Sequence, residues 1–140
     1  MITNRHGNCK IIYKCDVVPT AQQIIELYNN AQLPRPTNNP PRIKAMFENS
    51  DLVVTAWDGD RLVGVARTIT DWVWCSYLAD LAVSPGYKRS GIGKKLIDLT
   101  REKVGEQSML LLLSVPTAMD YYPKVGFVKE NRAFIIHRTK

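Results

Sequence analysis

Long apolar runs are missing from this sequence of 140 residues. Its apolar stretches, such as residues 109–113, are far shorter than the roughly 18 residues that a membrane-spanning helix needs. The first residues, 1–7, lack the apolar core of a secretion signal. These absences predict a cytoplasmic protein with no membrane partner.

Cysteine and histidine are also scarce. The three cysteines, Cys9, Cys15 and Cys75, are too few and too scattered for a disulfide framework, and none forms a CxxC pair for a metal. The only imidazoles that could activate a thiol nucleophile, His6 and His137, lie near the chain ends. We therefore expect reduced, packed thiols and no metal site.

The composition fits one globular domain over residues 1–140, with 45% hydrophobic and 23% charged residues. The net charge of +6 indicates by itself only a general attraction to anions. Neither a run of basic residues interleaved with aromatics nor a known nucleic-acid-binding motif is present, so binding to nucleic acid is not expected.

The first part of the chain predicts one strand and two helices. Residues 9–17 alternate weakly between apolar and polar types, which favours an opening strand. Thr20 and Gln23 form a capping-box pattern ahead of helically spaced apolar residues. Residues 33–41 hold four prolines and predict an extended loop, and a short helix is expected over about residues 41–48.

The middle of the chain predicts a sheet. Residues 51–57 and 62–69 are rich in β-branched side chains and are joined by Asp58-Gly59-Asp60, a pattern typical of a hairpin. Residues 74–83 predict a third antiparallel strand. Residues 109–115 are almost wholly apolar, which predicts a central strand buried on both faces by helices.

Further helices and closing strands complete the expected order. A helix should open within residues 87–93 and stop at Gly105. Thr117 and Asp120 predict the cap of a last short helix, and residues 127–137 should supply one or two closing strands. The result is an α+β fold with one mixed, mostly antiparallel sheet and helices on both faces.

The most informative segment is a strand, a glycine-bearing loop and a helix start around residues 84–93. The first N–H groups of a helix have no intrahelical partner and can bind phosphate oxygens. Four cations, Lys88, Arg89, Lys94 and Lys95, crowd this positive end of the helix dipole, and an anionic ligand would relieve that conflict. A solvated basic face is the alternative interpretation.

Two common phosphate-binding motifs are excluded by spacing. Gly86 and Gly91 are placed as in a Walker A loop, but Ile92 and Gly93 follow where Lys and Ser or Thr are required. A dinucleotide-binding fingerprint needs a third glycine where Leu96 stands.

A different motif does match. The segment Lys88-Arg89-Ser90-Gly91-Ile92-Gly93, following Leu81-Ala82-Val83, resembles the acyl-CoA motif Arg/Gln-x-x-Gly-x-Gly/Ala of the GCN5-related N-acetyltransferase (GNAT) superfamily. Residues 118–127 are similar to its second hallmark, an Ala followed by Tyr-x-x-x-Gly-Phe. The resemblance extends over most of the chain and implies a single GNAT-like domain.

The resemblance implies that acetyl-CoA lies between the strand ending at Val83 and the strand over residues 109–115. Backbone groups of Leu81 and Val83 would pair with the pantetheine arm. The implied contacts with the co-substrate are made by Leu81, Ala82, Val83, Lys88, Arg89, Ser90, Gly91, Ile92, Gly93 and Lys94. Two residues depart from the family pattern: Lys88 replaces Arg or Gln, and Val115 replaces a common Asn.

The resemblance also implies catalytic residues. Tyr122 occupies the position of the tyrosine that protonates the leaving thiolate, a role that suits a neutral phenol with a pKa near 10. Packing at the helix–sheet interface is the alternative. Asp80 is the only acidic residue of the 74–83 strand and a candidate base; alternation puts it opposite Ala79 and Leu81 unless a bulge intervenes. A structural role for Asp80 beside the site, with a water relay as the base, is the alternative.

The implied activity is direct transfer of an acetyl group from acetyl-CoA to a primary amine of a small molecule or peptide. The alternative is a CoA-binding sensor or interaction module without turnover. In the family the first two helices wall the acceptor site, where Arg35, Arg42 and Lys44 favour an amine that also carries a negative group. Dimerisation through the last strands is common in the family, so a homodimer is also implied.

Overall fold

One mixed sheet organises the chain, and the computed structural model describes it over residues 2–6 and 9–140. The strands lie side by side in chain order: β1 (Ile2–His6), β2 (Cys9–Lys14), β3 (Leu52–Asp58), β4 (Arg61–Thr70), β5 (Cys75–Val83) and β6 (Met109–Leu112). Neighbours from β1 to β5 are antiparallel, whereas β5 and β6 are parallel. The expected mixed, mostly antiparallel sheet is confirmed.

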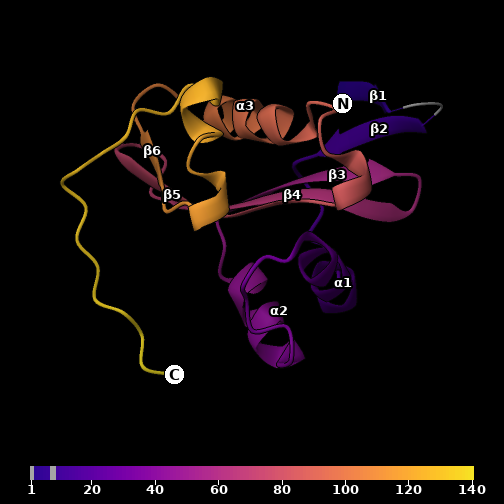
Figure 1. The fold of residues 1–140 in the computed structure, drawn as a ribbon, viewed down its shortest axis with the longest axis horizontal. Helices are drawn as coiled ribbons and strands as arrows, with labels where there is room; N and C mark the ends of the chain where they lie inside the picture. Colours follow the sequence, from indigo (N-terminus) through magenta and orange to yellow (C-terminus); the bar gives the residue numbers. More distant parts are fainter. Residues whose placement is uncertain (1, 7–8) are drawn as a thin grey trace.

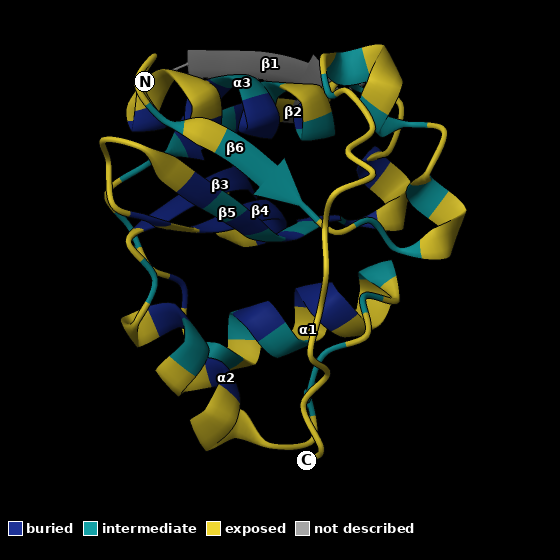
Figure 2. Cartoon of the chain, turned by 90° about the vertical axis from the view of Figure 1, so that its left-hand side faces the viewer, coloured by how far each residue is buried: buried dark blue, intermediate teal, exposed yellow. Residues whose placement is uncertain are grey.

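Helices cover both faces of this sheet, also as expected (Figure 1). Helices α1 (Ala21–Ala31) and α2 (Pro40–Glu48) lie on one face, and α3 (Ile92–Val104) lies on the other. The strands between these layers are the most deeply buried part of the molecule (Figure 2). No helix in the described part of the chain has the length and apolarity to span a bilayer.

Local sequence signals fix the starts of the first two helices. The Thr20 hydroxyl accepts the Gln23 N–H at 3.2 Å, and the Gln23 side chain accepts the Thr20 N–H at 2.9 Å. This is the predicted capping box, which satisfies two otherwise unpaired donors. At α2 the Asn39 side chain accepts the Arg42 N–H at 3.2 Å, and prolines fill the first turn, where their missing N–H costs nothing.

Helix α3 lies close to the sheet because Gly64 of β4 has no side chain. A Cβ at this position would lie 3.1 Å from Ile92 Cγ2, 3.1 Å from Leu96 Cδ1 and 3.3 Å from Ala56 Cβ. Ile92 and Leu96 are buried residues of the core between α3 and the sheet. Gly64 therefore sets how closely the helix that begins at Ile92 approaches β4.

Gly64→Val is expected to lower the free energy of unfolding by roughly 1–3 kcal/mol, because the added atoms overpack this contact. The measurement is urea unfolding monitored by circular dichroism. Gly86→Ala is the control, because a Cβ there meets nothing within 4 Å. Equal stability of Gly64→Val and the wild type would show that α3 can move away from the sheet without cost.

The end of the chain differs from expectation. The predicted central strand over residues 109–115 is the shorter β6, which lies at the sheet edge with β5 as its strand partner. The predicted closing strands over residues 127–137 are not formed in the described chain. A strand needs a partner for its backbone groups, and residues 128–140 instead run away from β6 toward α2 (Figure 1). There Arg42 donates to the Lys140 carbonyl at 3.2 Å.

Two other segments also differ. The expected last helix is replaced by two short 3₁₀ turns, η2 (Pro116–Ala118) and η3 (Tyr122–Val125). Pro123 would lie inside the expected helix, where its missing N–H and its ring break an α-helix. The expected cap by Thr117 and Asp120 is absent from these turns, whereas Gly126 ends η3 as predicted.

The N-terminal strands were only partly predictable. Strand β1 pairs with β2, but its sequence, ITNRH, is mainly polar and carries no strand pattern. Strand β2 ends at Lys14, whereas the expected strand extended to residue 17. The expected packing of Cys9 and the place of His6 as a base lie outside the residues whose side chains the structure describes.

Candidate active site

The candidate site begins where the two parallel strands part. Strands β5 and β6 pair from Cys75 opposite Met109 to Leu78 opposite Leu112. Strand β5 continues to Val83, while β6 ends at Leu112. Among the described residues, the β5 backbone beyond Leu78 therefore has no strand partner on the β6 side. Such an unpaired edge can hydrogen-bond an extended ligand.

A β-bulge lies at the same place. Arg67 of β4 pairs with Asp80 of β5, but the next residue, Thr68, pairs with Leu78, so Ala79 is an extra residue. A bulge turns the following side chains to the other face of the sheet. Leu78 accordingly belongs to the α3-side core, whereas Asp80 lies beneath α1. The bulge allowed for in the sequence analysis is therefore present.

The start of α3 is open to a ligand. A 3₁₀ turn, η1 (Pro85–Tyr87), follows β5, and Gly91 precedes the helix with a φ of 82°, a left-handed conformation that favours glycine. No described side chain caps the first turn of α3. Its first N–H groups thus remain available to an anion.

The loop before α3 is fastened to the β3–β4 hairpin. The Ser90 hydroxyl donates to the Tyr87 carbonyl, and the Tyr87 hydroxyl donates to the Asp58 carboxylate. The Arg61 guanidinium lies over the Tyr87 ring, 5.6 Å from its centroid. These contacts hold the loop in the shape that presents the helix start.

Positive charge surrounds this helix start. Lys94 is exposed and pairs with Asp98 at 2.7 Å, one turn along the helix. Lys88, Arg89 and Lys95 make no ion pair with the described residues. These three cations therefore supply charge that an anionic ligand can neutralise.

The two sequence hallmarks meet at Gly93. A Cβ at this glycine would lie 2.8 Å from the Tyr121 hydroxyl oxygen and 3.8 Å from Val83 Cγ2. The end of β5, the start of α3 and the Tyr-x-x-x-Gly-Phe segment thus converge at one point. Tyr121 therefore packs against the start of α3, so packing at the helix–sheet interface, the alternative considered for Tyr122, is a role of its neighbour Tyr121.

The neighbouring Tyr122 is half-buried, and its ring meets Tyr121 and Phe127 edge to face, with centroids 5.3 and 5.5 Å apart. Its hydroxyl makes no hydrogen bond within the described part of the chain. Burial raises the pKa of Tyr122, the nearby Tyr121 raises it further, and the charge of Arg35 partly opposes this. Tyr122 is therefore a protonated phenol whose hydroxyl is free to donate.

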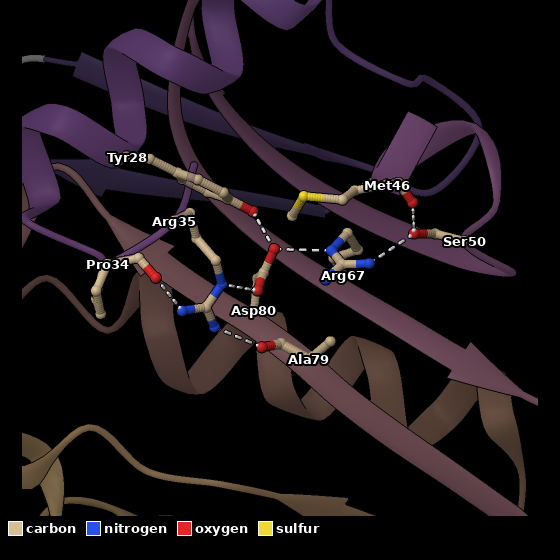
Figure 3. A network of polar contacts seen from close by, with 8 residues as sticks. All are labelled: Tyr28, Pro34, Arg35, Met46, Ser50, Arg67, Ala79 and Asp80. Atoms are coloured by element: carbon tan, nitrogen blue, oxygen red, sulfur yellow. Dashed lines mark hydrogen bonds and ion pairs between the residues drawn. The ribbon is translucent and has the colours of Figure 1, made fainter. Parts of the chain in front are cut away.

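Asp80 lies at the centre of a buried polar network (Figure 3). Its carboxylate is 0% exposed and accepts the Tyr28 hydroxyl at 2.7 Å, Arg67 Nε at 2.7 Å and Arg35 Nε at 2.6 Å. Burial alone would raise its pKa, but the hydrogen bond and charge of Arg67, with those of Arg35 and Tyr28, hold the pKa of Asp80 below its usual range. Asp80 is therefore an ionised carboxylate with both oxygens occupied.

Arg35 ties the loop between α1 and α2 to the bulge. Besides Asp80, it donates to the Ala79 carbonyl at 2.8 Å and to the Pro34 carbonyl at 2.7 Å (Figure 3). The geometry suits Asp80 to holding this loop better than to accepting a proton, so its role as a base stays a prediction. Burial and the negative charge of Asp80 together raise the pKa of Tyr28 well above its usual range.

Sequence reasoning did not identify the partners of Asp80. One signal could have indicated them: Arg67 is the only charged residue in the apolar run 62–69, and Asp80 is the only acidic residue of the 74–83 strand. Lone opposite charges in two adjacent, buried strands are expected to pair, because an unpaired buried charge is costly.

Comparison with known proteins identifies the family of this chain. A model of the GNAT acetyltransferase domain matches residues 20–137. The chain belongs to the GNAT acetyltransferases. The GNAT chain is 26% identical over 134 residues to the uncharacterized N-acetyltransferase ycf52 of Pyropia yezoensis, covering 86% of the chain and 75% of the relative.

Another relative and a solved structure are also similar to the chain. The chain is 30% identical over 95 residues to an uncharacterized ycf52-like N-acetyltransferase of Prochlorococcus marinus, covering 64% of the chain and 53% of that relative. The chain thus spans about half of the Prochlorococcus protein. The crystal structure of SA2161 from Staphylococcus aureus, a protein of unknown function, has the same fold, with a TM-score of 0.79 and 22% identity over 91% of this chain and 99% of that one.

Proposed function

We propose that this GNAT domain transfers an acetyl group from acetyl-CoA directly to a primary amine of a small molecule or peptide. The observation that carries the proposal is the convergence at Gly93, which brings the start of α3, the end of β5 and the tyrosine segment together. This arrangement supports a donor site and an adjacent proton donor within one chain.

The residues present suit acetyl-CoA. Its pyrophosphate is an anion, and the uncapped N–H groups of α3 with Lys88, Arg89 and Lys95 offer donors and positive charge. Its pantetheine arm carries amide groups that can pair with the unpartnered edge of β5 near Leu81 and Val83. Because these contacts use mainly backbone groups, the departures at Lys88 and Val115 do not remove them.

The chemistry requires one bond to form and one to break. Acetyl-CoA supplies an acetyl group activated as a thioester. The amine nitrogen bonds to the acetyl carbon as the carbon–sulfur bond breaks, and the Tyr122 hydroxyl gives its proton to the departing sulfur. The proton lost by the amine passes to water, because the oxygens of Asp80 are already occupied by Arg35, Arg67 and Tyr28. The products are an amide and free CoA.

The structure weakens the expectation that Arg35, Arg42 and Lys44 favour an acceptor amine with a negative group. Arg35 is paired with Asp80 at 2.6 Å, Lys44 lies 3.6 Å from Glu48, and Arg42 donates to the Lys140 carbonyl at 3.2 Å. The three cations that were expected to favour a negatively charged acceptor therefore already have partners. We accordingly propose the acceptor only as a primary amine.

The test is amine-dependent release of CoA thiol. The purified chain is incubated with acetyl-CoA and a panel of small amines and peptides, and free thiol and the mass of the acetylated product are measured. Release that requires both an amine and the protein supports the proposal. Binding of acetyl-CoA without release for any amine would instead favour a CoA-binding sensor.

A further inference from the structure

The turn between β4 and β5 presents large apolar side chains to solvent. Trp72 is 44%, Val73 58% and Trp74 77% exposed. Met109, which begins β6 beside this turn, is 58% exposed. We call these four residues the tryptophan surface. Tryptophan is enriched among the residues that contribute most to binding at protein interfaces, so two exposed indoles with apolar neighbours indicate an interaction site.

The turn has a fixed shape that does not itself require tryptophan. Asp71 Oδ1 accepts the backbone N–H groups of residues 73–75 at 3.0, 2.8 and 3.1 Å. The Thr70 hydroxyl accepts the Trp72 N–H at 2.9 Å. Trp72 has a φ of 71°, a left-handed conformation that glycine or asparagine adopts more readily than a bulky residue. The hydrogen bonds of the turn therefore explain its rigidity but not its exposed indoles.

Two other segments lie beside this turn. Asp51, just before β3, accepts the Thr70 N–H at 2.8 Å. Ser108, just before β6, shares a hydrogen bond of 2.6 Å with the hydroxyl of Ser76. The end of β4 and the starts of β3, β5 and β6 therefore meet at one end of the sheet.

The charge at this end of the sheet is negative, although the whole chain has a net charge of +6. The segments 49–51, 69–75 and 105–109 contain no lysine, arginine or histidine. They contain three exposed acidic residues: Asp51, Asp71 and Glu106. None of these carboxylates forms an ion pair with a described side chain. Hydrogen bonds from the backbone N–H groups of residues 73–75 lower the pKa of Asp71 to about 2, so it is ionised at neutral pH.

We propose that the tryptophan surface binds a segment of a partner protein in which arginine alternates with large apolar residues. The guanidinium groups would stack on the exposed indoles, because the indole face is the aromatic surface that attracts cations most strongly. The three carboxylates complement the same positive charges. The apolar residues of the partner would cover the rest of the surface. An anionic lipid surface fits less well, because the carboxylates would repel its headgroups.

The tryptophan surface is separate from the donor site. It lies at the start of β5, at Cys75, whereas the donor site lies at the end of the same strand, at Val83. A strand rises about 3.3 Å per residue, so the two sites are roughly 25 Å apart along β5. A bound segment therefore leaves the start of α3 open, and the proposal goes beyond acetyl transfer.

Fluorescence anisotropy of labelled peptides tests the proposal on the full chain. The probe is a short peptide of alternating leucine and arginine whose blocked N-terminus leaves no primary amine for acetyl transfer. The wild type is expected to bind it more tightly than a peptide of alternating leucine and glutamate. Trp74→Ser should weaken binding of the probe roughly tenfold or more, the effect of removing an interface tryptophan.

Met119→Ser is the matched control, because Met119 is also an exposed apolar residue but lies between η2 and η3. It should bind the probe like the wild type. Because the Trp74 side chain is mostly exposed, Trp74→Ser should keep the wild-type midpoint of urea unfolding. Equal binding of the two peptides by the wild type would overturn the proposal. So would equal binding of the probe by Trp74→Ser and the wild type.

A charge reversal tests the acidic surroundings. Glu106→Lys should weaken binding of the leucine–arginine peptide several-fold, because it replaces one of the three negative charges with a positive one. The control is Glu26→Lys, on α1 and beside Ser84, at the other end of β5, which should bind like the wild type. Unchanged binding by Glu106→Lys would contradict the proposed role of the carboxylates and overturn the proposal.

Sedimentation with vesicles tests a lipid as the occupant. The vesicles contain equal parts of phosphatidylcholine and phosphatidylglycerol. The wild type and Trp74→Ser are expected to sediment to the same extent. Sedimentation of the wild type that is lost in Trp74→Ser would assign the tryptophan surface to a lipid interface and overturn the proposal. The peptide and vesicle measurements are independent of acetyl transfer.

Discussion

Replacing Tyr122 with phenylalanine is expected to lower the kcat of acetyl transfer by roughly 10²–10⁴-fold, the contribution of a positioned general acid. The affinity for acetyl-CoA should stay nearly unchanged, because the phenyl ring keeps its contacts with Tyr121 and Phe127. The lower kcat follows from the loss of the Tyr122 hydroxyl as a proton donor. Burial raises the pKa of Tyr122, so the phenol is protonated at neutral pH. Steady-state kinetics with the amine found in the thiol-release screen, together with acetyl-CoA titration, measure both quantities.

Tyr77→Phe is the control for this variant. It removes the same hydroxyl from a partly buried tyrosine of β5, on the strand segment that pairs with β6. Its kcat should stay close to that of the wild type. If Tyr122→Phe also retained the wild-type kcat, the sulfur would not receive its proton from Tyr122, and the tyrosine would be a packing residue.

Asp80→Asn is expected to lower the free energy of unfolding by about 3–5 kcal/mol, the cost of breaking a buried ion pair. The substitution removes the negative charge between Arg35 and Arg67, and the Arg67 side chain is only 10% exposed. It also removes the attachment of the α1–α2 loop to the bulge. Urea unfolding at neutral pH measures the loss.

Asp98→Asn is the matched control. Its partner is also a cation, Lys94 at 2.7 Å, but both side chains are well exposed. Exposed pairs contribute only about 0–1 kcal/mol, so this variant should unfold almost like the wild type. Equal losses in the two variants would contradict the structural role assigned to the buried network.

The same network predicts a pH dependence. The interactions with Arg67, Arg35 and Tyr28 outweigh burial and hold the pKa of Asp80 below its usual range in the folded chain, whereas the unfolded value is about 3.9. The resulting stability is present above pH ~4 and is lost as the pH falls through the lower, folded pKa. Wild type should therefore lose more stability than Asp80→Asn between pH ~5 and ~2. The measurement is the free energy of unfolding of both proteins as a function of pH, and an equal loss in the two proteins would contradict this prediction.

Local sequence signals predicted most of the fold because they act over a few residues. The capping box at Thr20 and Gln23 and the turn between β3 and β4 need no distant partner to form. The apolar run of β6 correctly indicated a strand. It wrongly indicated a central, buried strand, because an apolar pattern does not identify the strands that pair with it, and β6 lies at the sheet edge. The prediction of closing strands over residues 127–137 was wrong because the sequence pattern did not show whether a partner strand would lie beside them.

The candidate site was partly predictable. The loop at residues 88–93 and Tyr122 came from motifs whose residues are adjacent in the sequence. The network of Tyr28, Arg35 and Arg67 around Asp80 joins four elements that only the folded chain brings together. The bulge at Ala79, which turns Asp80 toward this network, leaves no glycine or other mark in the sequence.

The central claim, a donor site for acetyl-CoA at the start of α3, is tested most directly by calorimetric titration. The wild type should bind acetyl-CoA but not ATP. Arg89→Glu, beside the open N–H groups, should weaken binding roughly tenfold or more, as expected for the loss of a charged hydrogen bond. Lys103→Glu, at the other end of α3, should bind like the wild type. Absence of acetyl-CoA binding, or equal binding by Arg89→Glu, would contradict the account.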